Sequence, residues 1–183
     1  IITGLSGSGK SIALRSLEDL GYFCIDNLSP KMIIQMLEVI KVSRQKIYKK
    51  IAISIDIRSI KMDVDYQNSI DSLYIELHKL DFKSTTVFLH SSPNILLSRF
   101  NATRRLHPLT NDKVDLKTAI SNEADIMQLL KEKSNLIIDS DKLLPLELKK
   151  EIASKISVIK NNKDMLIQLQ SFGYKNSIPN ESD

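Results

Sequence analysis

A glycine-rich loop near the start of the chain constrains the fold more than any other feature of this sequence. Three of the five glycines lie between positions 4 and 9, and the run fits G-x-x-x-x-G-K-[ST]. Glycines permit the backbone angles that turn N–H groups inward around an anion, and a following helix adds the positive end of its dipole. A glycine-rich turn can match by accident, but an apolar start and an amphipathic segment after it favour a phosphate-binding loop. The predicted phosphate-binding residues are Gly4, Leu5, Ser6, Gly7, Ser8, Gly9, Lys10 and Ser11.

Strand-like and helix-like segments alternate after this loop. Short apolar or β-branched runs predict strands at residues 22–26, 51–57, 85–89 and 136–139. Apolar residues on one helical face predict helices at residues 10–20, 31–42, 67–80, 93–106, 116–133 and 146–159. This rhythm predicts the α/β fold class, with a P-loop NTPase-type parallel sheet that carries helices on both faces.

Length and composition fit one globular domain with a small remainder. The chain has 183 residues, of which 42% are hydrophobic and 26% charged, and its longest apolar run is far shorter than the roughly 18 residues of a membrane span. We expect a P-loop nucleotide-binding domain at residues 1–159, with its first strand clipped. A linker at residues 160–163 and the first strand and turn of a truncated C-terminal domain at residues 164–183 would follow.

The net charge and the number of cysteines limit the cellular compartment and the kinds of partner that we expect. A single cysteine, Cys24, gives no disulfide framework, so we expect a cytoplasmic protein. We expect no membrane association, because no apolar run is long enough for a span. The formal net charge of +4 permits a nucleic-acid partner without requiring one.

A P-loop site also needs Mg²⁺ ligands, which are a hydroxyl at the start of the helix and a carboxylate on a neighbouring strand. Ser11 supplies the hydroxyl. Asp56, which follows an apolar strand, is the first candidate for the carboxylate, with Asp26 second and Asp139 third. An aspartate that ends a strand can instead cap the next turn or helix, and this alternative stays open.

Three of the six arginines lie together, at Arg99, Arg104 and Arg105. Arginine donates hydrogen bonds in a planar fork that suits phosphate, so we consider contacts from a mobile lid to a nucleotide phosphate or to an RNA backbone. The alternative is a solvated helix C-terminus, where cations already favour the helix dipole.

Several stretches together resemble the bacterial RapZ family, the RNase adapter proteins that have a P-loop nucleotide-binding N-terminal domain. The resemblance runs from end to end of the chain. Its motifs are residues 4–28, 54–58, 103–109, 137–140 and 171–175. Where the family has F-L-D-A, this chain has Phe88-Leu89-His90-Ser91, so the acid at that position is lost.

The resemblance implies ATP binding at the glycine loop and GTP binding around Asp56, Ile57, Arg58 and Ser59, with slow hydrolysis of both. In the adapter branch it implies that the protein presents a regulatory small RNA to an endoribonuclease and so controls glucosamine-6-phosphate synthesis. The C-terminal domain that senses a sugar phosphate would be missing here, and we expect a homo-oligomer. The alternative is a P-loop small-molecule kinase, because the same loop and arginine cluster suit phosphoryl transfer to a metabolite.

Overall fold

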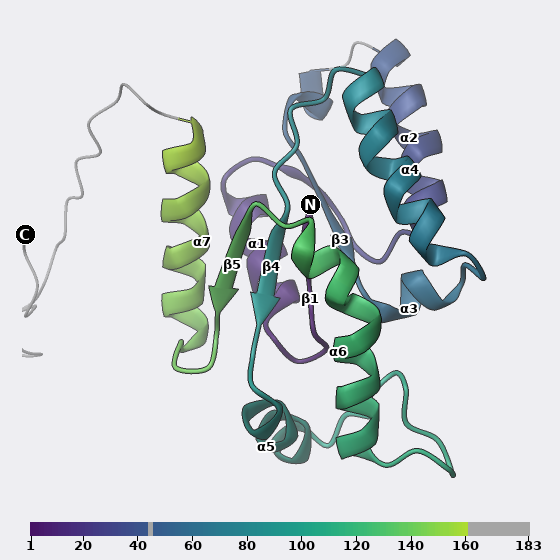
Figure 1. The fold of residues 1–183 in the computed structure, drawn as a ribbon. Helices are drawn as coiled ribbons and strands as arrows, with labels where there is room; N and C mark the ends of the chain where they lie inside the picture. The colour runs from purple at the N-terminus through teal and green to yellow at the C-terminus, as the bar shows by residue number, and fades with distance from the viewer. Residues whose placement is uncertain (44–45, 161–183) are drawn as a thin grey trace, which may run out of the picture.

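The computed structural model describes residues 1–43 and 46–160, and shows one sheet enclosed by helices (Figure 1). All strand pairs are parallel, and the strand order is β2-β3-β1-β4-β5. The strands are β1 (Ile2–Gly4), β2 (Phe23–Ile25), β3 (Ile51–Ile55), β4 (Val87–His90) and β5 (Leu136–Asp139). The helices are α1 (Lys10–Asp19), α2 (Pro30–Ser43), η1 (Lys46–Lys49), α3 (Ile57–Lys61), α4 (Tyr66–Lys79), α5 (Pro93–Thr103), α6 (Leu116–Glu132) and α7 (Pro145–Lys160). The predicted fold class is confirmed.

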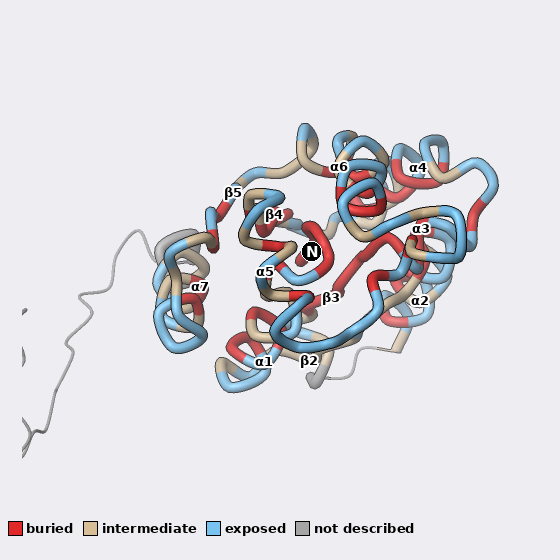
Figure 2. The backbone as a smooth tube through the Cα atoms, turned by 90° about the horizontal axis from the view of Figure 1, so that it is seen from below, coloured by how far each residue is buried: buried red, intermediate tan, exposed pale blue. Residues whose placement is uncertain are grey.

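The two faces of the sheet bury separate apolar clusters. In Figure 2, buried residues lie on α4 and α6 on one side of the strands and on α1 and α7 on the other. Successive side chains of a strand point to opposite faces. Ile53 and Ile55 of β3 therefore pack with the helices α2, α4 and α6, whereas Ala52 lies in the cluster under α1 and α7. This double cover requires strands that are apolar on both faces, which is why they read as continuous apolar runs.

The loop after β3 departs from the prediction. The strand ends at Ile55, two residues earlier than expected, and the helix α3 follows directly. Asp56 causes this change, because its side chain accepts hydrogen bonds from the N–H groups of Arg58 and Ser59 and so starts a helix. The capping alternative for Asp56 is therefore what this structure shows.

Two further boundaries differ from the prediction. The helix α5 ends at Thr103 rather than near residue 106, because Arg104 adopts a left-handed conformation with φ of 53°. The helix α7 runs through Lys160, the first residue of the predicted linker. Residues 161–163 and the predicted strand and turn at 164–183 lie outside the described residues. Within the described part of the chain, the helices are all too short or too polar to cross a membrane.

Candidate functional site

The predicted phosphate-binding loop joins the central strand β1 to the helix α1 at the carboxyl edge of the sheet. Gly4, Gly7 and Gly9 have φ of 141°, 85° and 105°, values that only glycine adopts readily. A Cβ atom on Gly4 would lie 2.2 Å from the carbonyl oxygen of Leu89 on the neighbouring strand. The first glycine of the motif is thus required by the close approach of β4 as well as by its own conformation.

Lys10 folds back onto this loop. Its Nζ donates to the carbonyl oxygens of Gly4, at 2.8 Å, and of Leu5, at 2.9 Å. Burial lowers the pKa of Lys10, while the nearby carboxylates of Glu123, Asp56 and Asp26 act in the opposite direction. The loop therefore holds an ammonium group beside N–H groups at the start of α1 that have no acceptor within the helix, which is an arrangement suited to an anion.

A cavity of about 770 Å³ opens above the loop. Three stretches of chain wall it: the phosphate-binding loop with Asp56 and Arg58, the segment from α5 to Pro108, and the turn between β5 and α7. Much of the last two walls is apolar. These apolar residues are Ile95, Phe100, Leu106, Pro108, Leu143, Leu144, Pro145 and Leu148. A cavity with a charged floor and apolar walls suits a ligand that combines phosphate with a flat, weakly polar group.

The four residues Asp56 to Ser59, for which the resemblance implies GTP, form the first turn of α3. Asp56 Oδ1 accepts from the N–H groups of Arg58 (2.9 Å) and Ser59 (3.3 Å), while Ile57 is fully buried in the core. Asp56 Oδ2 accepts from Nε and Nη2 of Arg58 at 2.9 and 2.5 Å. The Arg58 side chain remains 53% exposed on the cavity side. Arg58 is therefore placed to meet an anion, but both oxygens of Asp56 already have donors.

The alternative acids lie at the same edge of the sheet. Asp26 is exposed just after β2, and it is close enough to Lys10 to raise the pKa of that lysine. Asp139 ends the edge strand β5, where its Oδ1 accepts from the N–H of Asp141 at 2.9 Å. In the described residues, no cluster of three or more acidic, histidine or cysteine side chains could hold a metal unaided. Mg²⁺ in a P-loop site needs fewer protein ligands, because phosphates and water complete its shell.

The three clustered arginines have separate roles. Arg99 donates to the carbonyl oxygens of Gly7, at 3.1 Å, and Ser140, at 2.6 Å, and so ties α5 to the loop and to the end of β5. Arg104 terminates α5 and is exposed. Arg105 is exposed and lines the cavity. Arg105 is thus the member of the cluster best placed to reach a ligand.

Sequence reasoning missed a buried carboxylate, Glu123 of α6, that contacts Ser6 and His107. Both Glu123 and His107 have fully buried side chains. One signal was present in the sequence, since Glu123 lies on the apolar stripe of α6 with Ala119, Ile120 and Met127. A charged residue on a buried helix face needs a partner, and that partner is 117 residues away in the case of Ser6.

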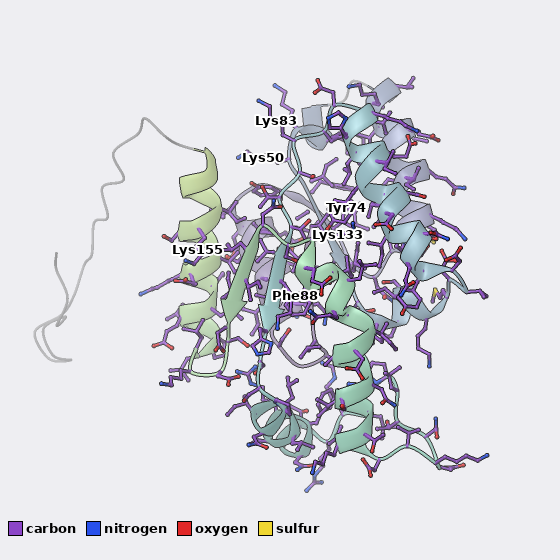
Figure 3. The ribbon with its side chains drawn as sticks, in the orientation of Figure 1. Lys50, Tyr74, Lys83, Phe88, Lys133 and Lys155 are labelled. Carbon is purple, nitrogen blue, oxygen red and sulfur yellow. The ribbon has the colours of Figure 1, made fainter. Side chains whose placement is uncertain are left out.

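Several lysines lie over aromatic rings outside the cavity. Lys133 Nζ is 5.6 Å from the centre of the Tyr74 ring and Lys50 Nζ is 5.8 Å from that of Tyr22. In Figure 3, Lys50 and Lys83 lie near the top, far from α5, whose position is labelled in Figure 1. Lys50, Lys83 and Lys133 therefore do not line the cavity above the phosphate-binding loop.

A parallel sheet of this order, with a glycine loop and its lysine at the carboxyl edge of the central strand, defines an α/β P-loop protein. The match of one family model covers residues 1–160. The chain belongs to the RapZ-like N-terminal domain family.

Curated relatives carry the name nucleotide-binding protein. The one from Clostridioides difficile is 39% identical over 183 residues, and the one from Caldicellulosiruptor bescii is 35% identical over 184 residues. Each alignment covers 100% of this chain but 62% of the relative, so the chain spans about three fifths of these proteins.

Solved structures of shikimate kinases share the fold. The enzyme from Bacteroides thetaiotaomicron aligns with a TM-score of 0.54 and 15% identity, over 87% of this chain and 97% of that one. The enzyme from Acinetobacter baumannii, in complex with shikimate, gives a TM-score of 0.54 and 14% identity, over 87% and 92% of the two chains. At such identities the likeness concerns the fold alone.

Proposed function

We propose that this chain binds a nucleotide, with the phosphates of ATP held by the glycine loop. The observation that carries the proposal is the position of Lys10, whose half-buried ammonium lies on the loop carbonyls at the floor of the 770 Å³ cavity. The names of the curated relatives support a nucleotide as the ligand. The apolar walls between Leu106 and Leu144 offer the base a surface on which to lie.

An ATP titration of Lys10→Ala tests this proposal. Removal of the ammonium should weaken ATP binding by at least about tenfold, since a hydrogen bond to a charged group contributes about 1.5–3 kcal/mol. Ser11→Ala should also weaken the binding of ATP with Mg²⁺. Lys113→Ala is the matched control, because Lys113 is an exposed lysine in the loop before α6. An unchanged ATP affinity in Lys10→Ala would refute the phosphate-loop assignment.

We propose Mg²⁺ as the cation that accompanies ATP. Ser11 lies exposed at the start of α1, where its hydroxyl can face a nucleotide phosphate. Asp56 remains our first choice for the carboxylate. For Asp56 to bind Mg²⁺, directly or through water, the Arg58 guanidinium would have to move away from Oδ2 of Asp56. Asp26 offers an exposed alternative. ATP titrations at different Mg²⁺ concentrations compare Asp56→Asn with Asp26→Asn. The variant that needs more Mg²⁺ to bind ATP identifies the carboxylate that binds the cation.

We propose that GTP is the nucleotide that meets Asp56, Ile57, Arg58 and Ser59, with slow turnover of ATP and GTP. The support is that the exposed Arg58 lines the same cavity as the loop. Arg58→Ala should weaken GTP binding more than ATP binding. Equal losses for the two nucleotides would remove the separate GTP assignment.

At the level of the whole protein, we propose a regulatory adapter that presents a small RNA to an endoribonuclease and so controls glucosamine-6-phosphate synthesis. Membership of the RapZ-like family supports this role. The RNA, the endoribonuclease, the sugar phosphate and homo-oligomerisation would involve the two fifths of the relatives that this chain does not span. Such partners would place the protein in the cytoplasm.

Crosslinking in the native host followed by sequencing of bound RNA tests the adapter role. We expect one or a few small RNAs, bound with an affinity that falls steeply as salt rises. Equal capture of all RNAs, or of none, would contradict it.

The second candidate is a small-molecule kinase, which one observation favours: the cavity extends from the loop to Arg58, leaving room for an acceptor beside the phosphates. Phosphate transfer to a metabolite at roughly 1–100 turnovers per second would establish the kinase. Release of phosphate only to water, and far more slowly, would favour the adapter.

A further inference from the structure

Glu123 contacts two parts of the candidate site at once. Its Oε1 accepts from the N–H of Ser6 at 3.0 Å and from Ser6 Oγ at 2.8 Å, and its Oε2 also lies 3.0 Å from the Ser6 nitrogen. The same Oε2 is 2.9 Å from Nε2 of His107. Ser6 belongs to the phosphate-binding loop, and His107 lies buried between Leu106 and Pro108, which form part of the wall of the cavity. A single carboxylate of α6 therefore joins the loop to that wall.

Hydrogen bonding fixes the tautomer of His107. The backbone N–H of Leu109 donates to Nδ1 of the ring at 3.1 Å. Because Nδ1 accepts this bond, it carries no proton, and the proton of the neutral imidazole lies on Nε2. Nε2–H therefore donates to Glu123. Both ring nitrogens of His107 are thus engaged, Nε2 with Glu123 and Nδ1 with the N–H of Leu109.

The Glu123 carboxylate is held by neutral donors rather than by a cation in direct contact. Among the described side chains, His107 is the one basic side chain within 4.0 Å of this carboxylate, whereas Asp56 and Asp63 pair with Arg58 and Lys31. A buried carboxylate is costly unless all its hydrogen bonds are made. Movement of either Ser6 or His107 away from Glu123 would leave that charge short of a donor, so the positions of the two are linked.

The neighbouring contacts carry this link into the cavity. The Phe100 ring of α5 packs on His107, with ring centres 5.1 Å apart, and a Cβ atom on Gly7 would lie 3.3 Å from Phe100. Arg105 and Leu106, directly before His107, line the cavity. A displacement of the loop at Ser6 and Gly7 therefore reaches Arg105 and Leu106 through contacts that are already closely packed.

We propose that Glu123 is a positioning residue that couples the phosphate-binding loop to the segment 104–109, so that an anion bound at the loop fixes the arginine-bearing wall of the cavity. The inference rests on the proposed nucleotide site. Glu123 touches no ligand in this scheme. It acts through Ser6 on one side and through His107 on the other.

Hydrogen exchange of the full chain, followed amide by amide with and without ATP and Mg²⁺, tests the coupling. Two variants break the link: Glu123→Gln, whose amide group supplies one acceptor oxygen instead of two, and His107→Leu, which removes the donor. His107→Gln is the rescue variant, because its amide nitrogen can replace Nε2–H. Asp125→Asn, an exposed change on the same helix, is the matched control.

In the wild type and in Asp125→Asn, ATP should slow exchange in both segments, 5–11 and 104–109. In Glu123→Gln and His107→Leu it should slow exchange at the loop only, with ATP affinity lowered by about tenfold or more. His107→Gln should restore protection of 104–109. Protection of both segments with unchanged affinity in the two link-breaking variants would overturn the proposal, as would failure of His107→Gln to differ from His107→Leu. If Glu123→Gln does not fold, the two His107 variants decide the matter.

The nucleotide-free protein separates this inference from the proposed function. Failure of the wild type to bind ATP would refute the nucleotide site. The link itself is then judged by exchange at the Ser6 and Leu109 amides without ligand. Faster exchange at both amides in Glu123→Gln than in Asp125→Asn supports it, and equal rates overturn it. A long-range proton–nitrogen spectrum of His107 adds a direct readout: a proton on Nε2 alone is expected, and one on Nδ1 contradicts the link.

Discussion

Lys10 Nζ lies 2.8 Å from the carbonyl oxygen of Gly4, so the lysine of the motif contacts the first glycine of the same loop. The ammonium thereby ties the two ends of the loop together through the carbonyl oxygens of Gly4 and Leu5. A phosphate entering the loop would compete with these carbonyls for the same three protons. We therefore expect phosphate binding to replace the contacts of Lys10 with Gly4 and Leu5 by contacts with the phosphate.

The pH dependence of ATP binding follows from the burial of Lys10, which lowers the pKa of its ammonium below the ordinary value for lysine. A bound phosphate favours the charged ammonium and raises that pKa again. ATP affinity should therefore be constant at lower pH and fall, by up to about tenfold per pH unit, as pH rises through the pKa of the free protein. ATP titrations between about pH 7 and about pH 10 measure this effect. Lys10→Met should bind weakly and show no such decline, and a wild-type affinity that rises over this range would contradict the prediction.

Asp56 should contribute to stability mainly through its cap. Asp56→Ala removes the acceptor for the N–H groups of Arg58 and Ser59, and we expect the free energy of unfolding to fall by about 1 kcal/mol. Asp56→Asn keeps an acceptor and should cost only a few tenths of that amount. Urea unfolding followed by circular dichroism measures both. Equal losses in the two variants would assign the stabilisation to the ion pair with Arg58 instead.

Arg99 and Arg105 should respond differently to substitution. Arg99→Ala removes hydrogen bonds to Gly7 and Ser140, so the free energy of unfolding should fall by about 1–3 kcal/mol. Arg105→Ala should leave stability within about 0.5 kcal/mol, as exposed positions usually do, but weaken ATP binding. Thermal unfolding and ATP titration of both variants test the contrast. A stable Arg99→Ala protein together with a destabilised Arg105→Ala protein would reverse the roles of the two arginines.

Glycine substitutions should separate crowding from backbone conformation. Gly4→Ala places a methyl group 2.2 Å from the Leu89 carbonyl oxygen. We expect the free energy of unfolding to fall by more than about 3 kcal/mol, or the variant not to fold. Gly21, with φ of 76°, has no atom within 4 Å of the site of a Cβ. Gly21→Ala should therefore lower the free energy of unfolding by only about 1–2 kcal/mol, because alanine disfavours the left-handed conformation. Similar losses in the two variants, measured by urea unfolding, would contradict this distinction.

Local patterns were sufficient to predict most of the fold. The parallel sheet follows from apolar runs alternating with amphipathic helices, and the strand, loop and helix around Lys10 follow from the motif. The end of β3 was misplaced because Ile57 continues the apolar run, although the Asp56 cap already starts a helix there. The sequence contains both the apolar run that favours a strand and the aspartate that favours a helix start, and it does not show which of the two prevails.

The links between distant segments could not be predicted in the same way. Arg99 belongs to an arginine cluster by sequence, but its contacts with Gly7 and Ser140 depend on how α5 packs beside the loop. Glu123 is unusual on an apolar helix face, yet nothing local identifies Ser6 and His107 as its partners. Such pairings arise from the tertiary arrangement and appear only once the helices are placed.

The central position of β1 has a mechanical consequence. This strand is bonded to β3 on one side and to β4 on the other, so its end, where the glycine loop begins, is a fixed floor. The rims of the cavity, from Thr103 to Pro108 and from Asp141 to Pro145, lie outside the sheet ladder. Rearrangement on ligand binding is therefore expected in the rims and in the part of the loop at Ser6 and Gly7 that is linked to them, while the end of β1 stays still.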